Sequence, residues 1–162
     1  MDRWIWICRW LPKTKENLSL LDVGCGSGAF TINASARGYD CIGLSWDEAN
    51  MNKANKRAKN ILKNEPTFVI KDCRDLNNFK KGTQYDFVLN TENIEHILDD
   101  KKLFTDLAEK VKPGGYLLLT TPYYFYKPIS EGDMGPFQTI ENGGHVRRGY
   151  SKSNLKYLCE IN

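Results

Sequence analysis

The stretch that decides the fold runs from Leu20 to Phe30 and reads LLDVGCGSGAF. A short apolar run, residues 18–23, stops at glycines, and helix-compatible residues follow. Glycine at a turn from strand to helix lets the backbone bend sharply and approach a ligand closely. The pattern therefore predicts a strand, a ligand-binding loop built on Gly24, Gly26 and Gly28, and a helix.

The same alternation continues along the chain. Further strands are expected at residues 39–44, 67–71, 85–89 and 116–121, and helices at residues 29–37, 47–62, 101–111 and 151–161. Pro113, Gly114 and Gly115 should end the helix at 101–111, and residues 123–150 should form a loop or lid. Strands that alternate with helices predict an α/β fold, an open and mostly parallel sheet with helices on both faces. Ligands bind such sheets at the carboxyl ends of the strands.

Composition and charge favour one small folded domain over the whole chain, residues 1–162. Hydrophobic residues make up 41% and charged residues 27%, and the net charge is +3 without a basic run, so no stable complex with nucleic acid is expected. Five cysteines without a CxxC pair favour reduced thiols and a cytoplasmic protein. The Trp-rich residues 1–11 are too short to span a bilayer, so no transmembrane segment is expected. They pack on their own domain or lie on a membrane surface, and packing is favoured.

The glycine loop alone admits two kinds of ligand. Gly24, Gly26 and Ala29 satisfy the GxGxxA pattern of dinucleotide-binding loops. Asp22 argues against that ligand, because a carboxylate at a strand tip suits an ammonium group and does not suit a pyrophosphate. A nucleotide-dependent oxidoreductase would also need an acid after the second strand, and Gly43–Trp46 lacks one.

The whole LLDVGCGSGAF string resembles the first motif of the class I S-adenosylmethionine-dependent methyltransferases. The resemblance continues through residues 71–76 (KDCRDL), 85–89 (YDFVL) and 111–122 (VKPGGYLLLTTP), and thus covers nearly the whole chain. It implies a Rossmann-like sheet and a cofactor, S-adenosylmethionine. The cofactor-binding residues that follow are Asp22, Gly24, Cys25, Gly26, Gly28, Ser45, Trp46, Asp72, Cys73 and Asn90.

The resemblance also assigns roles at the far end of the cofactor. The carboxylate matching Asp72 reaches the adenine amino group, and the backbone at Cys73 pairs with the ring; alternatively, Asp72 merely caps a turn. Ser45 and Trp46 stand where many members carry an acid for the ribose hydroxyls. Ser45 would offer a weaker hydroxyl bond, and Trp46 either stacks on adenine or belongs to the core.

Chemistry-bearing side chains follow the fourth expected strand, within Asn90–His96. Methyl transfer to a hydroxyl requires alignment of the nucleophile and removal of its proton. His96 is the candidate base, and Glu95 the residue that orients it. Alternatively, His96 has only a structural role and forms hydrogen bonds within the loop.

A metal site is a second hypothesis for the same residues. The ExxEH string plus a distant histidine resembles the metal set of the small-RNA 3′-end 2′-O-methyltransferases. That resemblance implies Mg²⁺ or Mn²⁺ held by Glu92, Glu95, His96 and His145. The ubiquinone-pathway O-methyltransferases carry a similar string.

The acceptor itself remains unidentified at this stage. Arg147 and Arg148 either meet an anionic group or form a solvated pair, and the latter is favoured. Compared with the family, the chain has about five strands and lacks the C-terminal hairpin, so the open edge of the fifth strand predicts a homodimer.

We therefore expect an O-methyltransferase acting on a small-molecule, sugar or lipid-linked acceptor. One alternative is a non-catalytic module, shortened relative to the family, that holds the cofactor or a partner protein. A minor alternative is an RNA 2′-O-methyltransferase.

Overall fold

The computed structural model describes residues 3–61, 65–129 and 131–161 of the chain. Within them, five parallel strands form one sheet in the order β3-β2-β1-β4-β5. The strands are β1 (Ser19–Val23), β2 (Asp40–Ser45), β3 (Thr67–Ile70), β4 (Tyr85–Thr91) and β5 (Val111–Thr120). The α/β expectation is confirmed.

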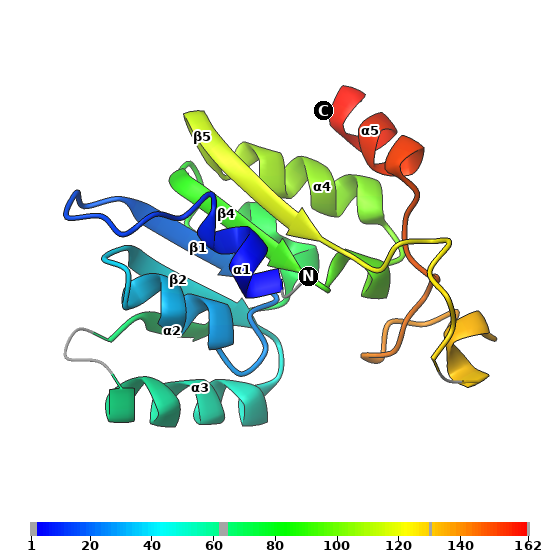
Figure 1. The fold of residues 1–162 in the computed structure, drawn as a ribbon, viewed down its shortest axis with the longest axis horizontal. Coiled ribbons are helices and arrows are strands. Elements are labelled where there is room, and N and C mark those ends of the chain that lie inside the picture. Colours follow the sequence, from blue (N-terminus) through cyan, green and yellow to red (C-terminus); the bar gives the residue numbers. More distant parts are fainter. Residues whose placement is uncertain (1–2, 62–64, 130, 162) are drawn as a thin grey trace.

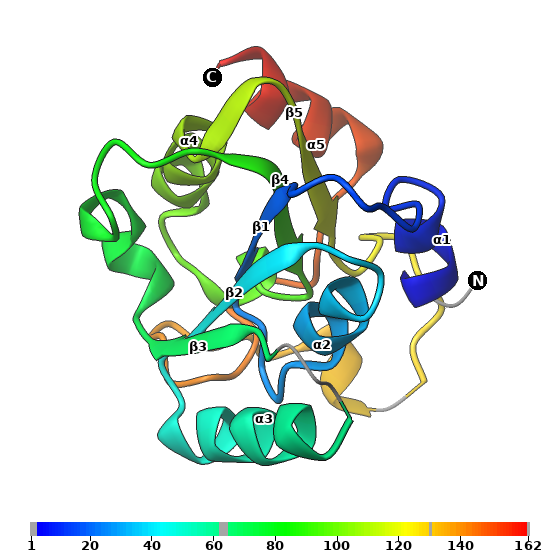
Figure 2. The ribbon, with the colours of Figure 1, turned by 90° about the vertical axis from the view of Figure 1, so that its left-hand side faces the viewer.

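Helices cover both faces of this sheet (Figures 1 and 2). The α-helices are α1 (Arg3–Cys8), α2 (Ala29–Ser35), α3 (Glu48–Ile61), α4 (Asp100–Glu109) and α5 (Lys152–Glu160). Short 3-10 helices add η1 (Cys73–Asn78), η2 (Ile94–His96) and η3 (Glu131–Met134). The helix expected at 47–62 is found, although Leu62 lies outside the described residues.

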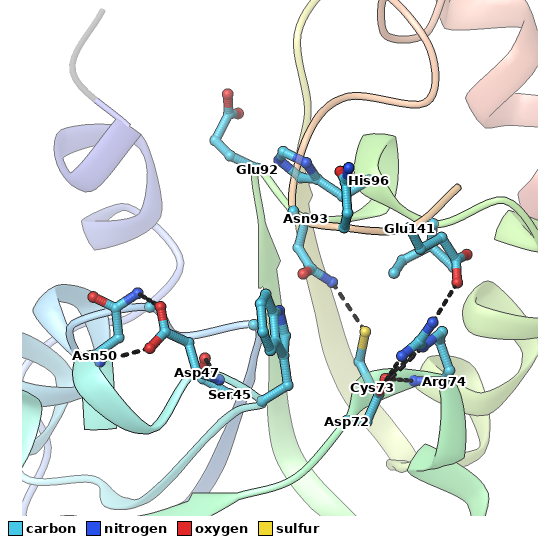
Figure 3. Close-up of a pocket in the computed structure, with 16 residues that line it drawn as sticks. Ser45, Asp47, Asn50, Asp72, Cys73, Arg74, Glu92, Asn93, His96 and Glu141 are labelled. Atoms are coloured by element: carbon cyan, nitrogen blue, oxygen red, sulfur yellow. Dashed lines mark hydrogen bonds and ion pairs between the residues drawn. The ribbon is translucent and has the colours of Figure 1, made fainter. Parts of the chain in front are cut away.

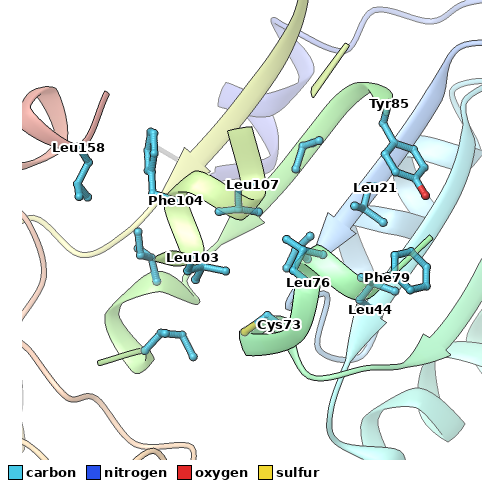
Figure 4. Packing of buried hydrophobic residues seen from close by; sticks show 14 of the residues in the cluster. Leu21, Leu44, Cys73, Leu76, Phe79, Tyr85, Leu103, Phe104, Leu107 and Leu158 are labelled. Atoms are coloured by element: carbon cyan, nitrogen blue, oxygen red, sulfur yellow. The ribbon is translucent and has the colours of Figure 1, made fainter. Parts of the chain in front are cut away.

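Alternate residues of the central strands face two different cores. Leu21 and Val88 belong to the core cluster that also contains Leu107 of α4, Leu76 of η1 and Leu158 of α5. Figure 4 shows part of this cluster. On the other face, the core contains Leu20, Phe87, Leu89 and Leu118 from the strands, with Ile7, Leu11 and Ala34 from the N-terminal segment and α2. Continuous apolar strands are the expected result when both faces of a parallel sheet are covered.

The N-terminal segment packs on its own domain, as favoured. Ile7 and Leu11 are fully buried, and Trp4 stacks on Phe30 of α2 with ring centroids 5.9 Å apart. None of the helices in the described residues is long and apolar enough to cross a membrane. The five cysteines are free thiols.

The expected boundary between α4 and β5 was wrong. The helix ends at Glu109, and Pro113, Gly114 and Gly115 lie inside the strand instead of stopping the helix. The register shifts here, because Tyr85 pairs with Val111 while Phe87 pairs with Tyr116. This irregularity accommodates a proline without an N–H group and the positive φ of 80° at Gly114.

The segment 123–150 is mostly irregular, as expected for a loop or lid. A single bridge pairs Tyr123 with Tyr150, and η3 interrupts the loop. Ser151 then caps α5, with the Ser151 and Asn154 side chains bonding reciprocally. The loop therefore begins and ends beside the carboxyl end of β5.

Candidate functional site

The carboxyl ends of the strands surround a cavity of about 630 Å³. That volume is within the range of small-molecule sites. Of the predicted residues, the cavity is lined by Gly24, Gly26, Ser45, Trp46, Asp72, Cys73, Glu92 and His96. The remaining predicted residues, Asp22, Cys25, Gly28, Asn90, Glu95 and His145, are not part of this lining.

The glycine loop follows β1, and its glycines satisfy different requirements. Gly24, Gly26 and Gly28 have φ values of 79°, 53° and 76°, which favour glycine. A Cβ at Gly24 would lie 2.5 Å from the Asn93 side chain, and one at Gly28 would lie 2.7 Å from the Phe68 ring. A Cβ at Gly26 would meet nothing within 4 Å. Gly24 and Gly28 thus permit close packing, whereas Gly26 leaves open space.

Two predicted cofactor residues lie beneath this loop. Asp22 is fully buried, its Oδ2 accepts a hydrogen bond from Thr31 Oγ1 at 2.6 Å, and burial raises its pKa to about 6. Asn90 is also fully buried and donates from Nδ2 to Val23 O at 3.1 Å. Among the described residues, neither Asp22 Oδ1 nor Asn90 Oδ1 has a hydrogen-bond partner. Both groups are buried and neither lines the cavity.

The end of β2 presents an aromatic ring to the cavity. Trp46 is 61% exposed, so of its two interpretations the core position was wrong, and stacking on adenine stays a prediction. Its exposure follows from its position, because β2 ends at the preceding residue and the ring projects beyond the sheet edge. Ser45 Oγ accepts from Asp47 N at 3.3 Å.

An acid does line the cavity here, two residues after Ser45, where the sequence argument found none. The Asp47 carboxylate accepts from Asn50 N at 3.1 Å and from Asn50 Nδ2 at 2.8 Å at the start of α3. Asp is a common residue at the start of a helix, so the sequence indicates a capping role for Asp47. No sequence pattern indicates that Asp47 also lines a cavity.

The end of β3 carries Asp72 and Cys73. Asp72 lines the cavity and also caps η1 by accepting from Arg74 N at 2.9 Å. The capping interpretation is confirmed, and contact with adenine stays a prediction. The Arg74 guanidinium lowers the pKa of Asp72 by hydrogen bonding. Cys73 Sγ lies 3.7 Å from Asn93 Nδ2, which donates to it (Figure 3).

The end of β4 holds the titratable cluster. Glu92 has a positive φ of 50°, accepts from Thr120 Oγ1 at 3.1 Å and lies 3.3 Å from an Arg3 nitrogen. Glu95 is fully buried, which raises its pKa, and its Oε2 accepts from Thr121 Oγ1 at 3.1 Å. Positive φ in a residue other than glycine costs free energy and often marks a functional site.

Two histidines meet beside Glu95. The His96 and His145 ring centroids are 4.6 Å apart, and burial together with His96 lowers the pKa of His145. Glu95 Oε1 lies 3.9 Å from His96 Nε2, too far for a hydrogen bond. Among the described residues, Glu95 Oε1 and His96 Nδ1 are buried without hydrogen-bond partners. One ligand atom from each of Glu95, His96 and His145 lies within 4.8 Å of the others, and Glu92 is not part of that group.

The expectation of a solvated arginine pair was wrong. Arg147 bonds to Asp100 at 2.6 Å, to Leu98 O at 2.9 Å and to the Tyr150 hydroxyl. The Arg148 guanidinium lies 5.0 Å from the Tyr126 ring centroid and donates to Tyr126 O at 2.6 Å. Both residues therefore anchor the loop after β5, a non-local role that spacing does not reveal.

Sequence reasoning also missed half of the cavity wall. The additional lining residues are Asp47, Asn50, Arg74, Asn93, Ile97, Glu141, Asn142 and Gly143. Glu141–Gly143 belong to the long loop, and no local motif assigns them to a site. A parallel sheet with a glycine loop at its carboxyl edge and a cavity before it defines a Rossmann-like ligand-binding domain.

Comparison with known proteins identifies the family. A family model described as a methyltransferase domain matches residues 6–161, and the chain belongs to that family. Ubiquinone biosynthesis O-methyltransferase from Sinorhizobium medicae is 32% identical over 116 residues, covering 68% of this chain and 44% of the relative. The homologous enzyme from Rhizobium etli is 30% identical over 113 residues, covering 68% and 43%. The chain thus spans less than half the length of these relatives.

Solved structures share the fold. The YcgJ protein from Bacillus subtilis has a TM-score of 0.78 and 18% identity, covering 99% of this chain and 68% of that one. Magnesium protoporphyrin IX methyltransferase from Synechocystis, with bound S-adenosylmethionine, has a TM-score of 0.72 and 18% identity, covering 99% and 67%.

Proposed function

We propose that the chain is an S-adenosylmethionine-dependent methyltransferase domain that methylates an oxygen of a small-molecule, sugar or lipid-linked acceptor. The observation that carries the proposal is one cavity that joins the glycine loop, the Asp72–Cys73 edge and the His96 imidazole. Membership of the methyltransferase family and the O-methyltransferase relatives support it. Cytoplasmic location and dimerisation through the edge of β5 remain predictions.

The cavity fits this cofactor in three respects. The loop backbone at Gly26 faces open space, so nothing at that point blocks a close approach by the ligand. The exposed Trp46 ring offers a stacking face, and the Asp72 carboxylate offers an acceptor for an amino group. The buried Asp22 carboxyl behind the loop favours a positive charge in front of it.

The residues of the β4 end would perform the proton chemistry. When bound, the cofactor would supply a methyl group on a cationic sulfonium. The acceptor oxygen would attack the methyl carbon, so that an O–C bond forms, the C–S bond breaks and S-adenosylhomocysteine leaves. His96, in its neutral form, would accept the hydroxyl proton. Glu95 would stabilise the resulting imidazolium from 3.9 Å, a charge contact rather than a hydrogen bond.

A divalent ion, Mg²⁺ or Mn²⁺, is a second candidate at this position. The orphaned, buried Glu95 Oε1 and His96 Nδ1 support it, as do the close ligand atoms of Glu95, His96 and His145. Mixed imidazole and carboxylate donors suit Mn²⁺ better than Mg²⁺. In that case these residues would bind the ion and His96 would not act as the base.

Two other functions use the same fold. A non-catalytic module would bind the cofactor or a partner protein without turnover. An RNA 2′-O-methyltransferase would need a basic surface, and a net charge of +3 offers little support.

The deciding experiment is calorimetric titration with S-adenosylmethionine and S-adenosylhomocysteine, with NADH as the control ligand. We expect micromolar binding of the two sulfur compounds and none of NADH. Transfer of a labelled methyl group to a panel of phenolic, sugar, lipid-linked and RNA acceptors then separates the candidates. Binding without transfer to any acceptor favours the module, and absence of binding refutes the proposal.

The metal is tested separately with Mn²⁺ and Mg²⁺ titrations followed by EDTA. If the ion binds, His145→Ala should abolish metal binding and reduce turnover as strongly as His96→Ala. If His96 is the base, turnover should survive EDTA, and His145→Ala should have a much smaller effect than His96→Ala.

A further inference from the structure

One wall of the cavity comes from a segment distant in sequence from the rest. We call residues 140–144 the cover segment; its members Glu141, Asn142 and Gly143 line the cavity. A Cβ built on Gly143 would lie 3.6 Å from Cζ2 of Trp46, so the segment passes close to that ring. The cover segment and Trp46 therefore face the same ligand space.

Glu141 ties the cover segment to two other elements (Figure 3). Its Oε1 accepts from Leu98 N at 2.5 Å, just after η2, and its Oε2 accepts from Arg74 Nη1 at 2.7 Å, within η1. The Glu141 side chain is 16% exposed, so its carboxylate is largely shielded from water, whereas the Arg74 side chain is 50% exposed. Glu141 thus makes a charge-assisted hydrogen bond with one carboxylate oxygen and accepts a backbone N–H with the other. Such an arrangement is stronger than an ion pair whose two partners are both fully solvated.

Arg74 shares its guanidinium between two carboxylates. Its Nε donates to both oxygens of Asp72 at 2.9 Å, and its Nη2 also contacts Asp72, while Nη1 holds Glu141. The planar fork therefore fixes the orientation of Asp72 relative to the cover segment. A ligand that uses Asp72 as an acceptor meets a carboxylate whose position depends on this pair.

The cover segment continues directly into the histidine pair. Gln138 N donates to His145 O at 2.9 Å, which closes the loop, and Val146 N donates to Glu95 O at 3.1 Å. His145 follows the cover segment immediately and contacts His96. The cover segment and His145 are therefore adjacent parts of one loop, which is also attached to Glu95.

We propose that Arg74 and Glu141 are positioning residues that couple recognition of the adenine end of the cofactor to closure of the cover segment over it. The proposal rests on the proposed methyltransferase function. Because coupling is reciprocal, the pair that holds the segment closed also raises the affinity for the ligand beneath it. The same closure aligns His145 with His96.

The test uses S-adenosylhomocysteine as the probe, with calorimetry and hydrogen exchange on the same samples. Glu141→Gln should weaken binding about three- to tenfold, as expected for loss of a partly shielded ion pair. In the bound protein it should raise exchange in residues 138–146 and leave the protection of residues 24–28 intact. The control Glu160→Gln, which removes the exposed Lys156–Glu160 pair of α5, should change neither quantity.

A double-mutant cycle separates positioning from a general structural role. Arg74→Gln should weaken binding at least as much as Glu141→Gln, and Glu141→Gln should add little in the Arg74→Gln background. Additive losses of affinity in the double variant overturn this proposal. So do normal affinity and normal hydrogen exchange in Glu141→Gln. If residues 24–28 are still protected by the ligand in these cases, the proposed function stands. Absence of binding and of protection at residues 24–28 in the unmodified protein overturns both.

Discussion

The two halves of the cavity are built in different ways. The glycine-loop half, formed by Gly24, Gly26, Trp46 and Asp72, comes from residues that directly follow β1, β2 and β3. In the histidine half, Glu92 and His96 line the cavity, and Glu95 and His145 lie beside His96, so this half combines the end of β4 with a loop about fifty residues away. One half is local in sequence, and the other requires the tertiary fold.

Their polar groups differ as well. In the glycine-loop half, the Asp72 carboxylate is bonded to Arg74 before any ligand arrives. In the histidine half, Glu95 Oε1 and His96 Nδ1 are buried without partners in the described structure. Unsatisfied buried polar atoms cost free energy, and a protein retains them where function uses them. Asp22 Oδ1 and Asn90 Oδ1, near the glycine loop, also have no partner in the described structure. The difference therefore lies at the cavity wall, where Asp72 is already bonded and the histidine half leaves polar atoms available to a ligand or a proton.

The largest expected effect separates the two halves directly. His96→Ala should lower the rate of methyl transfer about 10²- to 10⁴-fold, because it removes the proton acceptor. Affinity for S-adenosylhomocysteine should change less than about twofold, since the glycine-loop half is intact. Single-turnover kinetics and calorimetry measure the two quantities. An equal loss of affinity and rate would mean that the halves do not act separately.

The second prediction addresses the close approach of Gly24, in the glycine-loop half, to Asn93, which follows β4. Gly24→Ala places a Cβ 2.5 Å from Asn93 at a φ of 79°, so affinity for S-adenosylhomocysteine should fall. We expect a loss of about ten- to a hundredfold, from backbone strain plus displacement of Asn93. Gly82→Ala is the matched control, because its φ is 78° and its Cβ would meet nothing within 4 Å. Equal affinity losses in the two variants would assign the effect to global stability.

Sequence reasoning succeeded where the structure is local. The string from Leu20 to Phe30 correctly predicted a strand, loop and helix. Ser45, at the end of β2, and Asp72, two residues after β3, line the cavity as expected for the ligand edge of the sheet. The chain is continuous across each of these turns, so hydrophobic pattern and glycine content carry the information. The end of α4 was predicted wrongly from Pro113, because a strand at the edge of a sheet tolerates a proline at an irregularity.

The rest depended on tertiary contacts. Glu141 and Arg74 are 67 positions apart, and only folding brings them to 2.7 Å. The family resemblance proposed His145 for the site, but its contact with His96 depends on the path of the loop. Trp46 was ambiguous because aromatic residues beside strands are common both in cores and in binding sites.

The third prediction concerns the pH dependence of folding. The Asp22 pKa rises from 3.8 to about 6 in the folded protein, so the free energy of unfolding falls as the pH increases from about 4 to 6. Asp22→Asn removes this penalty, so its stability relative to the unmodified protein should improve by about 2 kcal/mol between pH 4.5 and 7.5. Urea unfolding at both pH values measures the difference. A pH-independent difference would refute the shifted pKa of Asp22.

The smallest expected effect tests how far the glycine-loop half is preformed. Trp46→Ala should weaken binding of S-adenosylhomocysteine about three- to tenfold, by loss of a stacking face that the open cavity already presents. Trp10→Ala is the control, because Trp10 is 47% exposed and lies against Tyr116, away from the cavity lining. The weaker binding should appear with little change in the methyl-transfer rate at saturation, since the histidine half is unaltered. A fall in that rate would instead mean that Trp46 acts through the cover segment on His145, so that the two halves close as one unit.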